Sequence, residues 1–387
     1  MRIALFTDSF LPGIGGTETV VDKLALGLMK EHEVMVFAPR FRRPFDDGAK
    51  PYPIVRAPSI TLTKNESWAL PGINRRIKKA LDKFKPDVIH THTLGMMAGY
   101  ANKYGRKNNI PVVCTVHTKF KNCFKDVLHI GLLVNIVLKW IMRRANGADR
   151  VTTVSNCMIE ELKSYGLKKQ VVVIRNGSDI IKFEGEKARP KKFTMIFVGM
   201  VTKFKNIGFS LKALAELKKT HPDFTFNIIG AGPHVNYFKR QAKKLGLKDN
   251  VNMVGPIFDR DKINEYYRNS DLFLFTSTGD SDGLVVVEAA SNGVPSLVIE
   301  RTGTAERIKD GENGFVAEND YVKVAEKIAM VMDDRKTLLE VGKRAHEISH
   351  DWKKIFTEYQ AVYQEEVQKN EAQEKIENID EIQVNVG

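Results

Sequence analysis

The stretch Ser277–Glu300, STGDSDGLVVVEAASNGVPSLVIE, indicates the fold most clearly. An apolar run over Leu272–Phe275 precedes it and predicts a buried strand. A polar turn leads to Gly283, a helical pattern then runs to Gly293, and Pro295 begins a second apolar strand. Strand, loop, helix and strand form the repeating unit of a parallel sheet, and ligands bind such sheets at the carboxyl ends of the strands.

The loop and the helix carry two acids, Asp280 and Glu288, eight positions apart. The backbone amides of Gly283, Leu284 and Val285 open the helix, where unpaired N–H groups and the helix dipole favour a phosphate. An acid at such an end is suited to accept hydrogen bonds from sugar or ribose hydroxyls. The alternative is structural, with Asp280 as a loop or N-cap residue and Glu288 as a solvated helix residue.

The same stretch resembles the E-x7-E signature of the retaining glycosyltransferases of family 4. The matching residues are Gly283, Leu284, Val285, Glu288, Ala289, Gly293 and Pro295. Two positions depart from the signature: Asp280 stands for its first Glu, and Asp282 for the usual Phe. The resemblance implies that Glu288 holds the ribose of a nucleotide and that Asp280 contacts the donor sugar.

Length and composition predict two domains without disulfides. A chain of 387 residues with 43% hydrophobic residues can bury two cores. The cysteines Cys114, Cys123 and Cys157 lack metal-ligand spacing and indicate a reducing compartment. No long apolar segment follows the start MRIALFTD, and no stretch reaches the roughly 18 apolar residues of a spanning helix. We therefore expect a cytoplasmic protein, with a peripheral position on the inner face of the membrane as the alternative.

The formal charge of +13 limits the choice of partners. It fits anionic small molecules, an anionic membrane surface or nucleic acid, or simply a basic soluble protein. No helix-turn-helix, RRM-type or zinc-finger pattern occurs, and aromatic residues are not interleaved with basic ones, so we expect no nucleic-acid partner.

A glycine-rich loop follows the first predicted strand, Ile3–Thr7. Such a loop can present amides to a diphosphate, although a tight turn without a ligand is the alternative. It is not G-x-G-x-x-G, so no dinucleotide fingerprint is present. In family 4 enzymes a P-x-x-G-G loop at this place faces the donor phosphate and the acceptor, and Gly15 and Gly16 match it.

Histidines occur near the ends of two predicted strands. His90 and His92 lie on and just beyond Asp87–Thr91, where they could form half of a metal site, although we favour structural or acceptor-facing roles. His117 ends the strand Pro111–His117 and is placed for ligand contact, with packing as the alternative. The segment resembles the family's P-x-V-x-T-x-H, which implies that His117 lies beside the donor sugar and its phosphate.

Two basic regions suggest contact with a membrane surface. Residues 40–80 are basic and loop-rich, and a solvated face is the simpler interpretation. The apolar segment Val127–Met142 is followed by Arg143 and Arg144 and is too short to span a bilayer. It fits a membrane interface, an apolar acceptor pocket or a buried core helix.

The second half repeats the alternation of strands and helices, with strands expected at 194–198, 224–229 and 251–254. The charged stretch Glu184–Lys192 is the expected linker. After the first strand, the family pattern places a glycine at Gly199 and a lysine at Lys205. Met200 replaces the arginine that contacts the diphosphate in the family, so we expect Lys203 or Lys205 to supply more of that contact.

The alternation of strands and helices predicts an α/β protein with two Rossmann-like, doubly wound domains, and the resemblance implies that they form a GT-B architecture with an interdomain cleft. We expect domains at 1–186 and 191–350, a helix at 351–368 that crosses back to the first domain, and an acidic tail at 369–387.

The resemblance implies a retaining transfer of a hexose from a nucleotide sugar, with UDP as the expected nucleotide. The expected catalytic residues are His117, Asp280 and Lys205. The expected donor-binding residues are Gly15, Gly16, Gly199, Lys205, Gly283, Leu284, Val285 and Glu288. In retaining members the leaving phosphate is thought to act as base, so we expect no protein base. We identify no Asp-x-Asp metal motif that would serve the phosphates, so we expect no metal ion or other cofactor.

The acceptor remains open at this level. A membrane lipid such as diacylglycerol fits the basic first half, and a lipid-linked or soluble glycan of surface polysaccharide is the alternative. A nucleotide-sugar binding protein without turnover is a further alternative, suggested by the departures at Asp280 and Met200.

Overall fold

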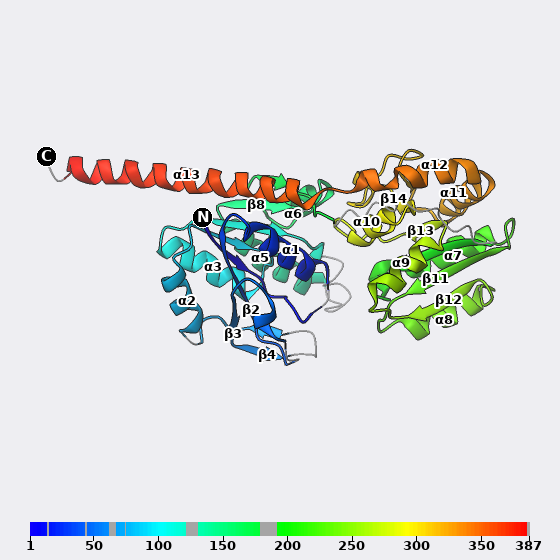
Figure 1. Ribbon diagram of the computed structural model, residues 1–387, viewed down its shortest axis with the longest axis horizontal. Helices are drawn as coiled ribbons and strands as arrows, with labels where there is room; N and C mark the ends of the chain where they lie inside the picture. The colour runs from blue at the N-terminus through cyan, green and yellow to red at the C-terminus, as the bar shows by residue number, and fades with distance from the viewer. Residues whose placement is uncertain are drawn as a thin grey trace. The chain divides into compact units, whose positions relative to one another are not determined.

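The computed structural model describes residues 1–13, 15–42, 45–61, 67–73, 75–120, 131–178 and 192–384. They form two compact units: unit 1 is built from residues 1–121, 128–177 and 352–387, and unit 2 mainly from residues 178–351. Each unit contains a parallel sheet flanked by helices, which confirms the two Rossmann-like domains (Figure 1). Most of the expected linker and the start of the apolar segment at 127–142 lie outside the described residues.

The sheet of unit 1 has the strand order β3-β2-β1-β6-β7-β8-β9, with every pairing parallel. Its strands are β1 (Arg2–Phe6), β2 (Glu33–Pro39), β3 (Ile54–Ala57), β6 (Val88–Thr91), β7 (Val112–Val116), β8 (Arg150–Thr153) and β9 (Val171–Val173). The chain starts at β1, moves outward to β3 and returns to β6 on the other side of β1. The order therefore reverses between β1 and β6, the place where such sheets bind ligands.

The helices of unit 1 cover this sheet. They are α1 (Gly16–Leu28), α2 (Arg76–Phe84), α3 (Met96–Lys107), α5 (Gly131–Asn146), α6 (Cys157–Ser164) and α13 (Trp352–Val384). α3 packs against β6, β7 and α5, whereas α1 packs against α13. The approach of α1 to α13 requires a glycine, because a Cβ on Gly27 would lie 2.0 Å from the ring of Phe356.

The stretch that we expected to be loop-rich, residues 40–80, contains more structure than predicted. It holds the edge strand β3, the 3-10 helix η1 (Asp47–Ala49) and a small antiparallel pair, β4 (Ser59–Thr61) with β5 (Ser67–Ala69). Arg56 on β3 is buried, and its guanidinium donates to the carboxylate of Asp47 and to the carbonyl oxygens of Leu11 and Pro39. This basic side chain therefore holds loops together and is not part of a solvated face.

The sheet of unit 2 has the order β12-β11-β10-β13-β14-β15, again with parallel pairings. Its strands are β10 (Phe193–Val198), β11 (Phe224–Ile229), β12 (Val251–Gly255), β13 (Leu272–Phe275), β14 (Ser296–Ile299) and β15 (Phe315–Ala317). Its helices are α7 (Ile207–Leu217), α8 (Val235–Lys244), α9 (Arg260–Arg268), α10 (Leu284–Ser291), α11 (Tyr321–Asp333) and α12 (Arg335–Arg344). β13 and β14 are buried throughout, as their uninterrupted apolar runs predict. The order reverses between β10 and β13.

The C-terminal helix is longer than expected. α13 continues from Trp352 to Val384, through the stretch that we expected to form an acidic tail. No proline or glycine interrupts it, and Lys369 pairs with Glu365 one turn earlier. The helix belongs to unit 1, where the side chain of Asn370 donates to the carbonyl oxygen of Asn109.

Candidate functional site

The first group of expected site residues lies at the switch point of unit 2. Gly199 follows β10, and the loop that carries Asp280 follows β13, its neighbour in the sheet. Gly199 has a φ of +153°, which favours glycine, and its amide donates to the carbonyl oxygen of Ile229. The backbones are so close that a Cβ on Gly230 would lie 1.9 Å from the oxygen of Gly199. Close packing of the backbone therefore fixes the conformation of the loop after β10.

Lys205 and Asp280 meet at this switch point. Lys205 ends the 3-10 helix η2 (Lys203–Lys205), and its Nζ lies 2.5 Å from Asp280 Oδ1. The side chains are only 19% and 16% exposed, so the pair is shielded from water. The second carboxylate oxygen of Asp280, Oδ2, is buried and accepts no hydrogen bond from the described residues. The two side chains thus place a cation and an open acceptor atom side by side.

Neighbouring groups hold this pair. The side-chain amide of Asn206 donates to the carbonyl oxygen of Thr276, which ties the lysine loop to the aspartate loop. The rings of Phe204 and Phe275 lie 5.7 and 5.8 Å from the ammonium of Lys205. Contact with ring faces stabilises a cation that burial would otherwise penalise.

The helix α10 begins beside this pair. Gly283 is its N-cap, with a left-handed backbone at φ +67°, and a Cβ there would lie 2.3 Å from Thr304 Cγ2. Leu284 and Val285 follow in the first turn, and both are partly exposed. Their amides have no partner within the helix, because the first turn of any helix leaves its N–H groups unpaired. This helix start is suited to an anionic group.

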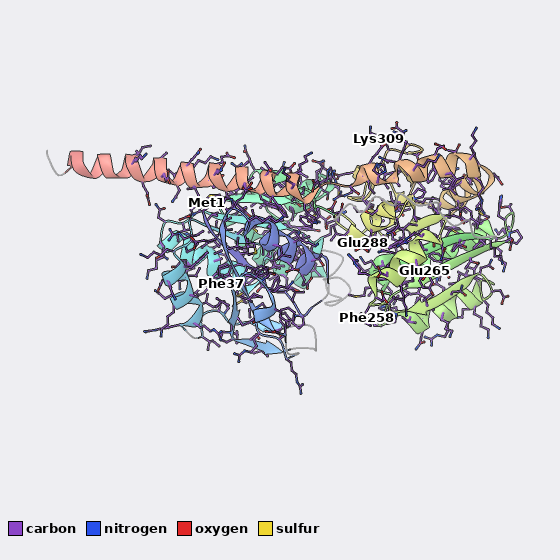
Figure 2. All side chains as sticks on the ribbon, in the orientation of Figure 1. Met1, Phe37, Phe258, Glu265, Glu288 and Lys309 are labelled. Carbon is purple, nitrogen blue, oxygen red and sulfur yellow. The ribbon has the colours of Figure 1, made fainter. Side chains whose placement is uncertain are left out.

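Glu288 lies one turn further along α10 (Figure 2). Its carboxylate accepts a hydrogen bond of 3.1 Å from Arg260, the first residue of α9. Burial, together with the nearby negative charge of Glu288, raises the pKa of Tyr267 well above its usual value. The carboxylate of Glu288 is therefore held from one side by an arginine.

Asp282, the other departure from the signature, has a structural partner. Its carboxylate receives two hydrogen bonds from the guanidinium of Arg307, at 2.7 and 2.6 Å. The same guanidinium also donates to the carbonyl oxygen of Ile348. The two charged side chains are 2% and 0% exposed. Asp282 therefore has a structural role in this loop, as the partner of a buried arginine.

Asp280 and Asp282 are two positions apart, an Asp-x-Asp spacing that our expectation of metal independence overlooked. In the structure each carboxylate is already paired with a basic side chain, Lys205 or Arg307. Within the described ranges, no three histidine, cysteine or acidic side chains are grouped so that they could hold a metal ion.

The second group of expected residues lies in unit 1. Gly15 is the N-cap of α1, and Gly16 is its first residue. A Cβ on Gly15 would lie 2.4 Å from Glu18 Oε2, and the other carboxylate oxygen, Oε1, accepts a hydrogen bond from the hydroxyl of Ser9. The acid beside this helix start favours a hydroxyl-bearing ligand over a phosphate. The neighbouring residue, Ile14, lies outside the described residues.

His117 follows β7 and is buried beside His92, which follows β6. His92 Nδ1 lies 3.1 Å from His117 Nε2, and the two rings stack with centroids 5.4 Å apart. His90 lies within β6, with its ring centroid 3.9 Å from that of His92. His90 and His92 are both buried, and His92 is a direct neighbour of His117.

The structure thus brings the expected residues together in two sets. Unit 2 holds Gly199, Lys205, Asp280, Gly283, Leu284, Val285 and Glu288, and unit 1 holds Gly15, Gly16 and His117. Sequence reasoning missed the roles of Arg260 and Arg307 as partners of Glu288 and Asp282. No motif marks either arginine, because each is distant along the chain from the acid that it contacts.

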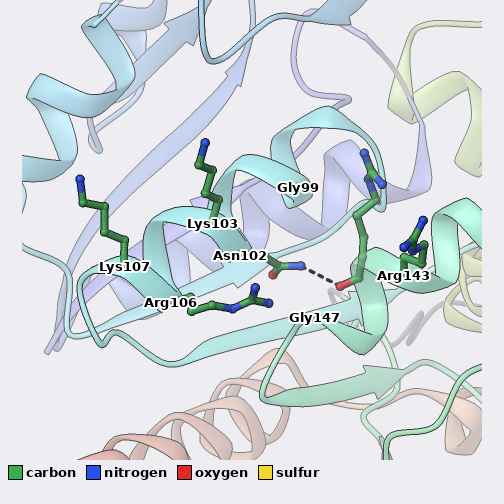
Figure 3. A pocket seen from close by; sticks show the side chains of 8 residues that line it. Gly99, Asn102, Lys103, Arg106, Lys107, Arg143 and Gly147 are labelled. Carbon is green, nitrogen blue, oxygen red and sulfur yellow. Dashed lines mark hydrogen bonds between the residues drawn. The ribbon is translucent and has the colours of Figure 1, made fainter.

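A basic pocket lies elsewhere in unit 1, between α3 and α5. It has a volume of 390 Å³ (Figure 3). The residues that line it are Gly99, Asn102, Lys103, Arg106, Lys107, Arg143, Arg144 and Gly147. Lys103, Arg106, Lys107 and Arg143 are exposed and form no ion pair with any described residue. The side-chain amide of Asn102 donates to the carbonyl oxygen of Arg144, which joins the two helices.

Comparison with known proteins places the chain in a family. Residues 14–181 match the family model described as Glycosyltransferase Family 4, and residues 178–348 match Glycosyl transferases group 1. Alpha-monoglucosyldiacylglycerol synthase of Streptococcus pneumoniae is 27% identical over 320 residues, or 77% of this chain and 70% of the relative. The enzyme of the same name from Acholeplasma laidlawii is 25% identical over 343 residues, or 81% and 84%.

Solved structures show the same fold. HepE of Anabaena in complex with UDP has a TM-score of 0.73 and 19% identity, with 94% of this chain and 100% of that chain covered. Sucrose-phosphate synthase of Thermosynechococcus elongatus has a TM-score of 0.72 and 18% identity, with 94% and 98% covered.

The two parallel-sheet units and these matches define a glycosyltransferase of the GT-B fold, an enzyme that moves a sugar from a nucleotide sugar to an acceptor. Within this class, the chain belongs to the glycosyltransferases of family 4. None of its described helices has both the length and the apolar composition needed to cross a bilayer.

Proposed function

We propose that the protein transfers a hexose, with retention of anomeric configuration, from a UDP-sugar to a membrane lipid such as diacylglycerol. The observation that carries the proposal is the contact between Lys205 and Asp280 at the start of α10. Two relatives named as alpha-monoglucosyldiacylglycerol synthases support diacylglycerol as the acceptor. A solved relative in complex with UDP-glucose supports the donor.

The chemistry assigned to each residue follows from its charge. Lys205 and the first amides of α10 stabilise the diphosphate as the bond between its oxygen and the sugar C1 breaks. Asp280 and Glu288 accept hydrogen bonds from the sugar and the ribose. The acceptor hydroxyl forms the new bond to C1 from the same face, and its proton passes to the departing phosphate oxygen. The proposal places His117 beside the donor sugar.

Donor binding then requires an exchange of partners. In the structure, the ammonium of Lys205 donates a hydrogen bond to the carboxylate of Asp280. A diphosphate oxygen would compete for that ammonium and would free the carboxylate of Asp280 for the sugar. The pair thus keeps two buried charges neutralised until the donor supplies both a negative phosphate and hydroxyl donors.

The experiment offers UDP-glucose, UDP-galactose, UDP-N-acetylglucosamine and GDP-mannose with diacylglycerol vesicles in EDTA, and detects products by mass spectrometry. We expect a glycolipid from a UDP-sugar, with the anomeric configuration of the donor by NMR. Lys205→Ala should reduce kcat/KM by about 10²- to 10³-fold. Lys212→Ala, an exposed control on α7, should not.

Other outcomes would change the proposal. Nucleotide release without a glycolipid would move the acceptor towards a glycan. If EDTA abolished the activity and Mg²⁺ or Mn²⁺ restored it, the expectation of metal independence would be wrong. Donor binding without any turnover would show a binding protein instead of an enzyme. Asp280→Glu, which restores the usual signature, should keep activity, and a change of preferred donor sugar would show that this position selects it.

The basic pocket between α3 and α5 supports contact with an anionic membrane surface. Ile136 and Trp140 of α5 are exposed one turn apart and lie on the same helix face as Arg144. An apolar stripe next to a cluster of basic residues suits the boundary between acyl chains and lipid phosphates. The pocket therefore provides a place where headgroup phosphates would meet exposed basic side chains.

Vesicle sedimentation tests this membrane contact. Each basic residue near an anionic surface contributes about 1 kcal/mol, so Arg106→Ala with Arg143→Ala should weaken binding to phosphatidylglycerol vesicles about 30-fold. Lys243→Ala with Lys244→Ala removes the same charge from α8 of unit 2 and should have little effect. An equal effect of both pairs would show a general charge effect and would contradict a membrane-facing pocket.

A further inference from the structure

The small antiparallel pair of unit 1, formed by β4 and β5, exposes its large apolar side chains. Ile60 on β4 lies directly opposite Trp68 on β5, so the two side chains extend from the same face of the pair. Ile60 is 55% exposed and Trp68 is 56% exposed. An antiparallel sheet with one face on a core normally buries its apolar residues and exposes its polar ones. The outer face of the β4–β5 pair has the opposite composition.

The inner face of the pair carries small and polar side chains. Ala69 is fully buried, the hydroxyl oxygen of Ser67 is buried, and the hydroxyl of Ser59 donates to the carbonyl oxygen of Arg40. β5 contacts β2 and α3, and β4 lies at the edge of unit 1 on the side away from α13 (Figure 1). The inner face therefore attaches the pair to unit 1, and burial within unit 1 does not account for the two apolar side chains of the outer face.

Basic residues follow this apolar face along the chain. Ile73, in the turn between β5 and α2, is 70% exposed and adds to the apolar surface. The exposed basic residues at the start of α2 are Arg75, Arg76, Lys78 and Lys79. The sequence from residue 67 to residue 81 contains no acidic residue. Exposed apolar side chains next to positive charge are complementary to a surface that is apolar inside and negatively charged outside, which is the composition of an anionic bilayer.

We propose that the β4–β5 pair inserts Ile60 and Trp68 into an anionic bilayer, at the boundary between headgroups and acyl chains, while the start of α2 contacts the lipid phosphates. Tryptophan suits this boundary, because its ring is apolar and its indole N–H can donate to a polar group. A second copy of the chain fits this face poorly, because a two-fold contact would bring the same basic residues together. The inference deepens the proposed function, since it names the element that enters the membrane from which a lipid acceptor would come.

The primary test uses Trp68 as its own probe in the full chain, without a sugar donor. Vesicles of phosphatidylcholine and phosphatidylglycerol are prepared with brominated acyl chains, which quench tryptophan fluorescence on contact. The difference in emission between the natural protein and Trp68→Phe isolates Trp68 from Trp140 and Trp352. We expect the brominated chains to quench Trp68. If the protein sedimented with the vesicles while Trp68 stayed unquenched, or if it did not sediment with them, the proposal would be wrong.

Substitutions test the two parts of the surface separately. Trp68→Ser removes one inserted side chain and should weaken vesicle binding by about 10- to 100-fold. Met330→Ser is the matched control, because Met330 is 52% exposed on α11 of unit 2, and it should change binding by less than about 2-fold. Arg75→Gln with Lys79→Gln should weaken binding about 30-fold at low salt and less at high salt, because each removes one charge near the anionic surface. An equal loss for Trp68→Ser and Met330→Ser would contradict the proposal.

The outcomes separate this inference from the proposed function. If the protein were a dimer without vesicles and Trp68→Ser made it a monomer in sedimentation velocity, the outer face would be an interface between copies and the inference would be overturned. Quenching of Trp68 without any glycolipid product would support the inference and refute the lipid acceptor. Glycolipid formation with an unquenched Trp68 would refute the inference alone.

Discussion

Replacement of Asp282 by alanine would break the buried ion pair that holds the loop ahead of α10. Arg307 would keep its hydrogen bond to the carbonyl oxygen of Ile348 but would lose the two bonds to the carboxylate. Its guanidinium, with a side chain 0% exposed, cannot reach water without local unfolding. The variant therefore removes the carboxylate that pairs with this buried charge.

The expected loss in the free energy of unfolding is large for a single substitution. Removal of one partner of a buried pair costs about 3–5 kcal/mol. In a unit of this size each kcal/mol lowers the melting temperature by about 2–4 °C, so the transition of unit 2 should fall by roughly 6–20 °C. Asp282→Ala with Arg307→Met removes both charges and should recover most of this loss.

Hydrogen exchange read at β13 and β14 separates unit 2 from unit 1, because both strands belong to the core of unit 2. Asp333→Ala is a matched control in the same unit: its carboxylate contacts His221 at 3.1 Å but is 72% exposed, so the change should stay within about 1 kcal/mol. A loss below about 1 kcal/mol for Asp282→Ala would refute the reasoning, and so would a double variant less stable than the single one.

Three further predictions concern single positions. Gly283→Ala should destabilise unit 2 by about 1–3 kcal/mol and weaken donor binding, both measurable by calorimetry, because a φ of +67° and the methyl group of Thr304 oppose a Cβ. Burial raises the pKa of the Cys114 thiol to about 12, so at pH 8 it should resist iodoacetamide in the folded protein and react in urea, as read by peptide mass spectrometry. The pKa values of His90 and His92 lie well below their usual range in the folded protein, so only the unfolded chain takes up these protons as the pH falls below about 6.5. The unfolding free energy of unit 1 should then drop by about 1.4 kcal/mol per pH unit for each histidine, and His90→Gln should remove one such contribution in urea titrations between pH 5 and 7.5.

Local sequence accounts for most of the strands and for the position of the site. Runs such as Leu272–Phe275 are too apolar to lie anywhere but inside a sheet, and the helices between them require parallel pairing. Because βα loops gather at the carboxyl edge of such a sheet, Asp280 and His117 were predicted to lie at or just beyond strand ends, where the structure has them.

The elements that sequence reasoning missed are those with weak local patterns. β3, Ile54–Ala57, is a four-residue edge strand that pairs with β2 alone. The length of α13 was underestimated because its last part is polar and offers no apolar stripe, although nothing in it breaks a helix.

The sequence by itself determined the two Rossmann-like domains, the order of their elements and the loops that carry the candidate site, because these depend on periodicity and on turn residues. Tertiary structure alone decided the partners: Lys205 with Asp280, 75 positions apart, and His90 with Tyr363, 273 positions apart. These contacts depend on which strands become neighbours and on where the last helix packs. Both follow from the packing of the whole chain, and no local pattern records them.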